Sequence, residues 1–480
     1  MKNRGFIEQY TIIASVIKWT FLSGIVGIII GATVTLFLNI LHTSESLRPL
    51  LPFHYYYLLP FALVFSVWLT KTFAPDAKGH GTEKVIEAVH KKSGDIKVSV
   101  IPVKLIATVV TLFAGGSAGK EGPGAQIGAG VASAISNKLH FSKQDRKKLV
   151  VCGISAGFAT VFGTPIAGAI FGIEVLIVGA LMYDLLLPSI VAGFSAFLTA
   201  QFLGVRYTYY EISYFQNYLI DISLIGKVIL AGIFFGFIAY FIVYMFKRVE
   251  NFIEQIPINP YKKAFLAGLG LVILSFIVGD RYFGLGLDSI SNALAYQSAP
   301  SDTPWYAFIL KTFYSAVTLA SGGSGGVVTP IFYIGATSGH FFGSIFANSD
   351  QIALFAALGF VSVLAAATNA PISAIIMAME LFGVDVAHYA VISIAISFLV
   401  MGHRSIFPSQ KLAMKKSDML NIEYGEDIEH SSVSLNKEQI EQLKRLKRRL
   451  KRERLRNKRL IQSLREKREK RKLKRQNSLK

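Results

Sequence analysis

Long apolar segments, separated by short polar ones, occupy most of the chain before residue 402. The segments that are apolar enough to lie in lipid cover residues 12–41, 56–73, 98–114, 185–202, 222–246, 264–278, 305–320, 352–367 and 386–401. Several are shorter than the roughly 20 residues with which a perpendicular helix crosses about 30 Å of hydrocarbon. Glycine and proline border others, and irregular backbone at membrane depth is tolerated only where it is buried in protein or lines a wet cavity. The pattern predicts an all-α polytopic membrane protein with short, tilted and broken helices.

Three landmarks of the first half return in the second half at offsets of 205, 207 and 206 residues. The pairs are residues 79–83 (GHGTE) with 284–288 (GLGLD), residues 115–129 with 322–336, and Pro165 and Glu174 with Pro371 and Glu380. A repeated order at a nearly constant spacing indicates an internal duplication. We expect one repeat at about residues 56–205 and another at about 260–405. Broken helices at matching places of two inverted repeats indicate a transporter with a binding site near the midplane.

Composition supports the membrane class, and charge divides the chain in two. Of the 480 residues 52% are hydrophobic and 17% are charged, below the roughly 25% of soluble domains, with a mean hydropathy of +0.46. Residues 437–480 hold 21 Lys and Arg against 5 Glu, which is +16 of the net charge of +20. We therefore predict a transmembrane domain over residues 1–410 and a basic cytoplasmic tail over 411–480, partly helical or disordered. Basic residues at both ends predict cytoplasmic termini, and so an even number of full crossings.

The tail has a helical stripe formed by Ile440, Leu443, Leu446 and Leu450 within a basic sequence. We expect it to be a solvated cytoplasmic helix that anionic lipid headgroups attract. A short coiled coil is the alternative. Nucleic acid is not an expected partner, because no aromatic residues interleave the charges as base stacking would require.

The two halves share glycines and prolines at matching positions. Both residue types favour helix ends, so these positions predict where helices start and stop. Pro123, Pro165, Pro330 and Pro371 each predict a helix start, since proline loses no hydrogen bond there. The glycines upstream of Pro123 and Pro330 leave backbone N–H groups exposed. A helix N-terminus carries free donors and about half a positive charge, so several together form an anion site. Partial charges also release an ion more readily than a fixed cation does.

Three acidic residues, Glu121, Glu174 and Glu380, stand near these prolines. Glu121 lies within the first cluster, and a carboxylate at membrane depth is a functional candidate by default. Its side chain fits the same amide cage as an anion, so it can act as a tethered, protonatable plug; the alternative is an acid that only stabilises its own helix dipole. Glu174 and Glu380 occupy equivalent places late in two half-helices. For these we favour structural hydrogen bonding or packing, because both repeats keep them.

Other kinds of site find little support in the sequence. Residues 115–121 (GGSAGKE) look like a phosphate-binding loop, but the first glycine is replaced by Ala114 and the hydroxyl residue after the lysine by Glu121. The nine His and the single Cys show no metal-ligand spacing, and no Gly-x-Ser-x-Gly elbow is present. We expect a protein that is not an enzyme and that uses no metal and no cofactor.

The motifs together resemble the CLC family of chloride channels and proton/chloride antiporters, over about Ala74 to Gln410. Residues 119–123 (GKEGP) are similar to its GK/REGP signature, residues 326–330 (GVVTP) to GxFxP, and residues 79–83 to GSGIP. The resemblance implies two inverted repeats in a homodimer with one anion pathway per subunit. It also implies that Glu121 is the gating glutamate. The residues that it implies for anion binding are His80, Gly81, Glu121, Gly122, Val327, Val328 and Phe407.

Three departures from the family pattern bear on function. His80 stands where the family has its central serine, and Phe407 stands where a tyrosine contributes the other side-chain hydroxyl. Val175 replaces the inner proton-accepting glutamate of many antiporters, as in the channel members. We therefore expect passive conduction of chloride or a similar small anion, gated by Glu121. The alternatives are proton-coupled antiport, a pathway for another anion such as nitrate or fluoride, and a membrane anchor whose tail recruits a partner. The missing cystathionine-synthase-like domains favour a prokaryotic source, so we expect the inner membrane.

Overall fold

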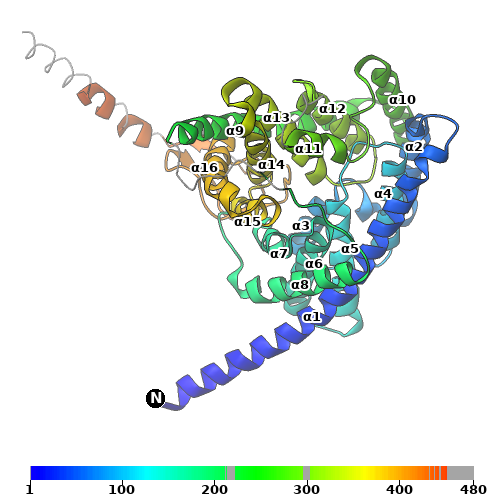
Figure 1. Cartoon of the computed structure of the whole chain (residues 1–480). Helices are drawn as coiled ribbons and strands as arrows, with labels where there is room; N and C mark the ends of the chain where they lie inside the picture. The colour runs from blue at the N-terminus through cyan, green and yellow to red at the C-terminus, as the bar shows by residue number, and fades with distance from the viewer. Residues whose placement is uncertain are drawn as a thin grey trace, which may run out of the picture. The chain divides into compact units, whose positions relative to one another are not determined.

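Helices joined by short turns form the part of the chain that the structure describes (Figure 1). The structure is a computed structural model, and it describes residues 2–210, 212, 222–295, 303–431, 433–436, 438–442 and 445–450, with the side chains of residues 2–6 left aside. The first eight helices are α1 (Lys2–Ser46), α2 (Leu59–Phe73), α3 (Gly81–Lys91), α4 (Val100–Phe113), α5 (Glu121–Lys138), α6 (Lys143–Phe162), α7 (Pro165–Glu174) and α8 (Leu186–Phe202). The later ones are α9 (Ile222–Gln255), α10 (Pro260–Val278), α11 (Leu287–Leu294), α12 (Ala307–Ala320), α13 (Val328–Phe346), α14 (Ile352–Thr368), α15 (Pro371–Phe382) and α16 (Val384–Met401).

The prolines lie in the first turns of four helices. Helices α7 and α15 begin at Pro165 and Pro371, as predicted. Helices α5 and α13 begin two residues before Pro123 and Pro330, which corrects the predicted starts. Because the first-turn N–H groups have no partner within the helix, proline is tolerated throughout this turn and does not mark its first residue.

The sequence correspondence between the two halves is also a correspondence in packing. Helix α5 packs along α6 and α13 along α14, and α7 contacts α15 across the two halves (Figure 1). Helices α6 and α14 both end at a left-handed residue, Gly163 with φ of 72° and Asn369 with φ of 56°. Such a residue stops a helix and allows the next one to start at the following proline. The fold is the predicted all-α membrane fold of two inverted repeats.

Two long helices precede the predicted repeats and pack in equivalent ways. Helix α1 lies against α8, and α9 lies against α16. The contacts are made by Gly27 and Gly31 on α1, and by Gly232 and Gly236 on α9. A Cβ on Gly27 would lie 2.5 Å from the carbonyl oxygen of Ala192, so the backbones approach as closely as small residues permit. The internal symmetry therefore extends to α1 and α9, which the predicted repeat bounds leave out.

Apolar helices of two lengths make up the membrane domain. The candidate spans among the described residues are Ile7–Leu50, Tyr55–Phe73, Tyr183–Phe202, Ile222–Gln255, Pro260–Val278, Ser349–Thr368 and Val384–Met401. The shorter apolar helices are α4, α7, α12 and α15. Burial differs sharply among the long ones, from 94% of the apolar window at Ser349–Thr368 to 28% at Pro260–Val278. Helix α14 thus lies in the protein core, while α10 keeps most of its apolar surface outside.

The C-terminal residues of the membrane domain add a small layer of extended chain. Strand β1 (Ile177–Val178) pairs in parallel with β2 (Lys411–Leu412), and Gly425–His430 runs along residues 408–412. Met1–Met414 and Gly425–His430 form one compact unit, and Lys415–Tyr424 with Ser431–Lys480 forms a second. Within the second unit β3 (Leu420–Asn421) pairs antiparallel with β4 (Ser434–Leu435).

The basic tail is described only in part. Residues 438–442 and 445–450 are helical, and Leu446 and Leu450 of the predicted stripe are exposed. Leu443 and most of residues 437–480 lie outside the described residues. The predicted lipid contact of the tail stays a prediction.

Candidate anion-binding site

Three helix N-termini meet where the two halves of the membrane domain touch. The N–H of Gly119 donates to the carbonyl oxygen of Gly326 at 2.7 Å, and the N–H of Gly326 donates to that of Gly119 at the same distance. This reciprocal pair places the first turns of α5 and α13 side by side. A Cβ on Gly81, the first residue of α3, would lie 2.4 Å from the carbonyl oxygen of Gly122. The partial positive ends of α3, α5 and α13 are thereby concentrated at one place, which favours an anion.

His80 and Phe407 border this junction. His80 immediately precedes α3 and forms a parallel bridge with Gly325 of the second half. Its ring lies beside that of Phe407, with 6.1 Å between the centroids, and Phe407 is fully buried. The Nδ1 atom of His80 is buried without a hydrogen-bond partner among the described residues. An imidazole nitrogen in such a place can donate to an anion or hold a proton.

The carboxylate of Glu121 lies at the N-terminus of α13, in the opposite repeat. One of its oxygens accepts a hydrogen bond from the backbone N–H of Thr329 at 3.1 Å and another from the Thr329 hydroxyl. Glu121 is only 3% exposed. A Cβ on Gly119 would lie 2.6 Å from this oxygen, so a residue without a side chain is needed beside it. Val327 and Val328, which precede Thr329 at the start of α13, are buried.

Two buried lysines hold the loops that lead into α3 and α11. Each side-chain amino group donates to two carbonyl oxygens, which offsets the cost of burying a polar group. The bonds join Lys104 to Ala77 at 3.2 Å and Gly79 at 2.6 Å, and Lys311 to Tyr282 at 3.2 Å and Gly284 at 2.7 Å. Because Gly79 is next to His80, the Lys104 bonds also fix the backbone that carries His80 to the junction.

Glu174 caps the N-terminus of α15, and Glu380 caps the N-terminus of α7, each in the opposite repeat. Each carboxylate accepts two backbone hydrogen bonds from the first turn of a proline-started helix in the opposite half. The bonds run from Ile372 at 2.9 Å and Ser373 at 2.8 Å to Glu174, and from Ile166 at 3.0 Å and Ala167 at 2.8 Å to Glu380. These bonds confirm the predicted structural role, because each carboxylate satisfies donors that a helix start leaves free.

All seven residues predicted for the site lie at this junction or border it. The helix starts bring Gly81, Glu121, Gly122, Val327 and Val328 together, and His80 and Phe407 adjoin them. Sequence reasoning missed Thr329. The available signal was its place directly before Pro330, where the first repeat has Gly122. With the family's serine and tyrosine both replaced, a search for another hydroxyl would have found it.

Comparison with known proteins gives a consistent result. A family model described as "Voltage gated chloride channel" matches residues 62–402. A "Chloride/fluoride channel protein" of Pseudomonas syringae pv. tomato is 34% identical over 416 residues, which are 85% of this chain and 90% of the relative. An "H(+)/Cl(-) exchange transporter ClcA" of Vibrio cholerae is 26% identical over 381 residues, 75% of this chain and 81% of the relative.

Solved structures agree with the family match. The crystal structure of a CLC-type fluoride/proton antiporter superimposes with a TM-score of 0.76 at 30% identity, covering 82% of this chain and 98% of the other. That of a slow cyanobacterial chloride/proton antiporter gives 0.68 at 21% identity, covering 80% and 94%, and shows the shared fold. This chain therefore belongs to the CLC family of chloride channels and proton-coupled antiporters, and it is a membrane protein of CLC-type anion transport.

Proposed function

We propose that this protein exchanges fluoride for protons through a pathway that Glu121 closes. The observation that carries the proposal is the hydrogen bonding of the Glu121 carboxylate to the N–H and hydroxyl of Thr329. An anion that binds the first turn of α13 must displace this carboxylate. A proton on Glu121 favours this displacement. Hydrogen bonds to an ionised acceptor are roughly twice as strong as those to a neutral one, so the neutral carboxyl is bound more weakly than the anion that replaces it.

The competition itself supports coupling to protons. The carboxylate and the anion have the same charge and need the same donors, so each is bound best when the other is absent or neutral. Binding of the anion is then linked to uptake of a proton by Glu121, and the linkage is reciprocal. An exchanger needs this linkage, whereas a simple pore does not.

The donors at the junction support fluoride as the anion. Fluoride is closer in size to a carboxylate oxygen than chloride is, and it accepts hydrogen bonds more strongly. The Glu121 oxygen already lies against two donors of Thr329 that fluoride would use in its place. Names that include fluoride belong to the relative with 34% identity and to the solved structure with 30% identity, which adds support.

Passive conduction is the second candidate, and Val175 favours it. Its side chain is fully buried, and its carbonyl oxygen accepts a hydrogen bond from Gln410 Nε2 at 2.7 Å. A valine cannot accept a proton at the place where many antiporters have an acid. Antiport therefore requires another inner proton acceptor.

A flux measurement separates the two candidates. Liposomes containing the purified protein are given an outward fluoride gradient, and a fluoride electrode and a pH electrode record both ions. Antiport predicts that fluoride efflux drives protons inward against their gradient at a fixed ratio. Fluoride flux without proton movement would establish conduction instead. Faster exchange with chloride than with fluoride would overturn the choice of anion.

We also propose that residues 1–410 carry the transport, that two such chains associate with one pathway each, and that the basic tail is accessory with both termini in the cytoplasm. Deletion of Lys437–Lys480 tests the place of transport. We expect unchanged fluoride flux per folded protein, because the junction is built by residues before 410. Loss of flux in a folded truncated protein would assign the tail an essential role.

A further inference from the structure

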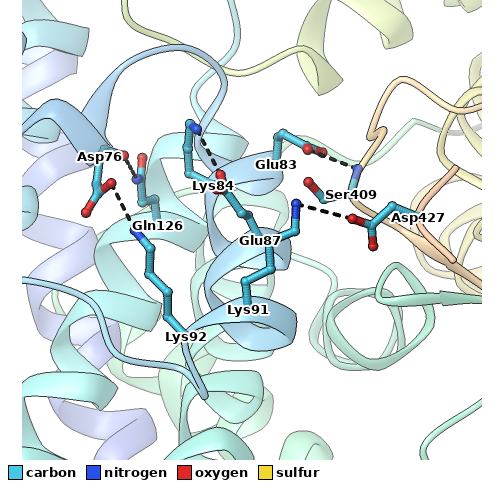
Figure 2. A network of polar contacts seen from close by, with 9 residues as sticks. All are labelled: Asp76, Glu83, Lys84, Glu87, Lys91, Lys92, Gln126, Ser409 and Asp427. Atoms are coloured by element: carbon cyan, nitrogen blue, oxygen red, sulfur yellow. Dashed lines mark hydrogen bonds and ion pairs between the residues drawn. The ribbon is translucent and has the colours of Figure 1, made fainter. Parts of the chain in front are cut away.

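Glu83 lies in the first turn of α3, close to the junction. A glutamate at the third position of a helix often bonds back to the N–H of the capping residue. Here the Glu83 carboxylate turns instead to the segment that carries Phe407, where it accepts the backbone N–H of Ser409 at 3.0 Å (Figure 2). The carboxylate is therefore held between α3 and residues 405–410.

Several buried polar atoms around this turn have no hydrogen-bond partner among the described residues. They are His80 Nδ1, Thr82 Oγ1, Glu83 Oε2 and Gln126 Oε1. Buried polar atoms almost always have partners, and where protein supplies none, water or an ion usually does. Two of the atoms also touch the helix starts. A Cβ on Gly122 would lie 3.3 Å from Thr82 Oγ1, and one on Gly81 would lie 2.9 Å from Gln126 Oε1.

These atoms lead from the junction towards Glu83. Gly122 directly follows Glu121, and Thr82 directly precedes Glu83. With a rise of about 1.5 Å per residue, the three residues from His80 to Glu83 advance about 5 Å along α3. The turn thus holds several buried polar atoms that water can bridge between the junction and Glu83.

The charged groups around Glu83 are mostly paired with one another (Figure 2). On the same helix Lys84 bonds to Glu87 at 2.9 Å, and Lys91 pairs with Asp427 of the segment Gly425–His430 at 3.2 Å. From residues 405–410 the contact is the Ser409 N–H. Within the described part of the chain, no cation lies at ion-pair distance from Glu83.

The far end of α3 reaches solvent. The side chains of Lys91 and Lys92 are 49% and 46% exposed, and Lys92 pairs with Asp76 at 3.1 Å. Glu83 is itself partly buried, and along α3 it lies between the junction and this polar surface.

We propose that Glu83 is the proton-transfer residue between Glu121 and the solution at this end of α3, a role that rests on the proposed antiport. In one direction, the O–H bond of protonated Glu121 breaks and its proton passes through water to the Glu83 carboxylate. Glu121 then carries the negative charge and Glu83 is neutral. Glu83 next releases the proton to bulk water and regains its charge. The sequence reverses when protons enter from solution, and it needs no reactant other than water.

Glu83→Gln tests the proposal in the liposome assay with both electrodes. The amide keeps an acceptor for the Ser409 N–H but cannot take a proton. We expect proton flux to fall by at least about tenfold while the ratio of protons to fluoride also falls, since a positioned acid or base contributes at least about 100-fold to proton transfer. Glu87→Gln, one turn further along the same helix, is the matched control and should keep the wild-type ratio.

The outcomes distinguish this proposal from the antiport on which it rests. Uncoupled fluoride flux in the wild-type protein would overturn both. Coupled flux in the wild type together with an unchanged ratio in Glu83→Gln would overturn only the role of Glu83. Thr82→Val provides a second test if the Gln variant does not fold, because it removes the buried Thr82 hydroxyl beside Glu83. It should lower proton flux more than fluoride flux, and equal fluxes to the wild type would contradict the route.

Discussion

The first turns of α5 and α13 have the same backbone arrangement but differ in their side chains. Both follow a glycine-rich loop, both hold a proline as their third residue, and Gly119 and Gly326 bond to each other in both directions. Across the 207-residue offset Glu121 corresponds to Val328, and Gly122 corresponds to Thr329. One repeat therefore supplies the acid and the other supplies the hydroxyl that binds it.

Elsewhere the two repeats keep the same side chains for the same purpose. Glu174 and Glu380 each cap a helix of the opposite half, and Lys104 and Lys311 each hold a loop. The comparison shows that symmetric residues build the junction, and we propose that the asymmetric ones gate the anion. Substitutions at the two kinds of position should accordingly fail in different ways.

The largest effect is expected from Glu121→Gln. The amide mimics the protonated carboxyl, so it no longer competes with the anion and carries no proton. We predict that proton flux falls by about 100-fold or more, the lower end of what a positioned acid contributes, and that fluoride flux loses its pH dependence. Fluoride flux recorded as a function of pH in both proteins checks this. A pH profile equal to that of the wild type would remove Glu121 from gating.

Glu174→Ala and Glu380→Ala should both reduce stability, and Glu174→Ala by more, because Glu174 is buried and Glu380 is only half-buried. Each leaves two helix-start N–H groups without their carboxylate, and loss of a partner costs about 1–3 kcal/mol for a buried group and less where water can replace it. Thermal unfolding of the purified protein in detergent measures the loss, with the proton-to-fluoride ratio of folded protein unchanged. A clear change of that ratio in only one variant would break the symmetry.

Thr329→Val should change selectivity rather than stability. It removes the hydroxyl and keeps the backbone N–H, and a hydrogen bond to a charged group contributes about 1.5–3 kcal/mol. We predict that the fluoride-to-chloride flux ratio falls by about tenfold, the equivalent of 1.4 kcal/mol. Thr337→Val on the same helix is the control, since that hydroxyl bonds to the Tyr333 carbonyl oxygen at 2.8 Å. A wild-type ratio in both variants would show that the Thr329 hydroxyl does not bind the anion.

A smaller effect is expected from His80→Ala. If the imidazole contacts the ion, the flux ratios among fluoride, chloride and nitrate change by a few-fold, within the 0.5–1.5 kcal/mol of an ordinary hydrogen bond. Leu285→Ala, at the corresponding position of the second repeat, should leave these ratios unchanged. An equal loss of flux for every anion in His80→Ala would indicate a role in folding.

Much of the fold could be predicted because its signals are local. The apolar segments correspond to helices, and Pro165 and Pro371 begin the helices expected of them. The repeated motifs identified the glycines that let α5 and α13 meet. The predicted repeats left out helices α1 and α9. These two helices resemble each other in a pair of glycines within apolar sequence, and only their packing distinguishes this pair from the other glycines of the chain.

The parts of the site that could not be predicted depend on contacts across the two repeats. Glu121 was identified from its position, but its partner Thr329 lies 208 residues away and was not. Glu83 likewise reaches Ser409, 326 residues along the chain. A sequence pattern reports on neighbours, so it shows that a side chain is unusual without showing which distant group it meets.

The proposed mechanism rests on one claim, that fluoride and the Glu121 carboxylate compete for the donors of α13, and proton uptake on fluoride binding tests this claim. Fluoride is added to the purified protein in weakly buffered detergent solution, and the pH is recorded as binding proceeds. The claim predicts uptake of up to about one proton per bound fluoride, because linkage between the two sites is reciprocal, and no uptake by Glu121→Gln. Fluoride binding without proton uptake, or uptake that persists in Glu121→Gln, would contradict it.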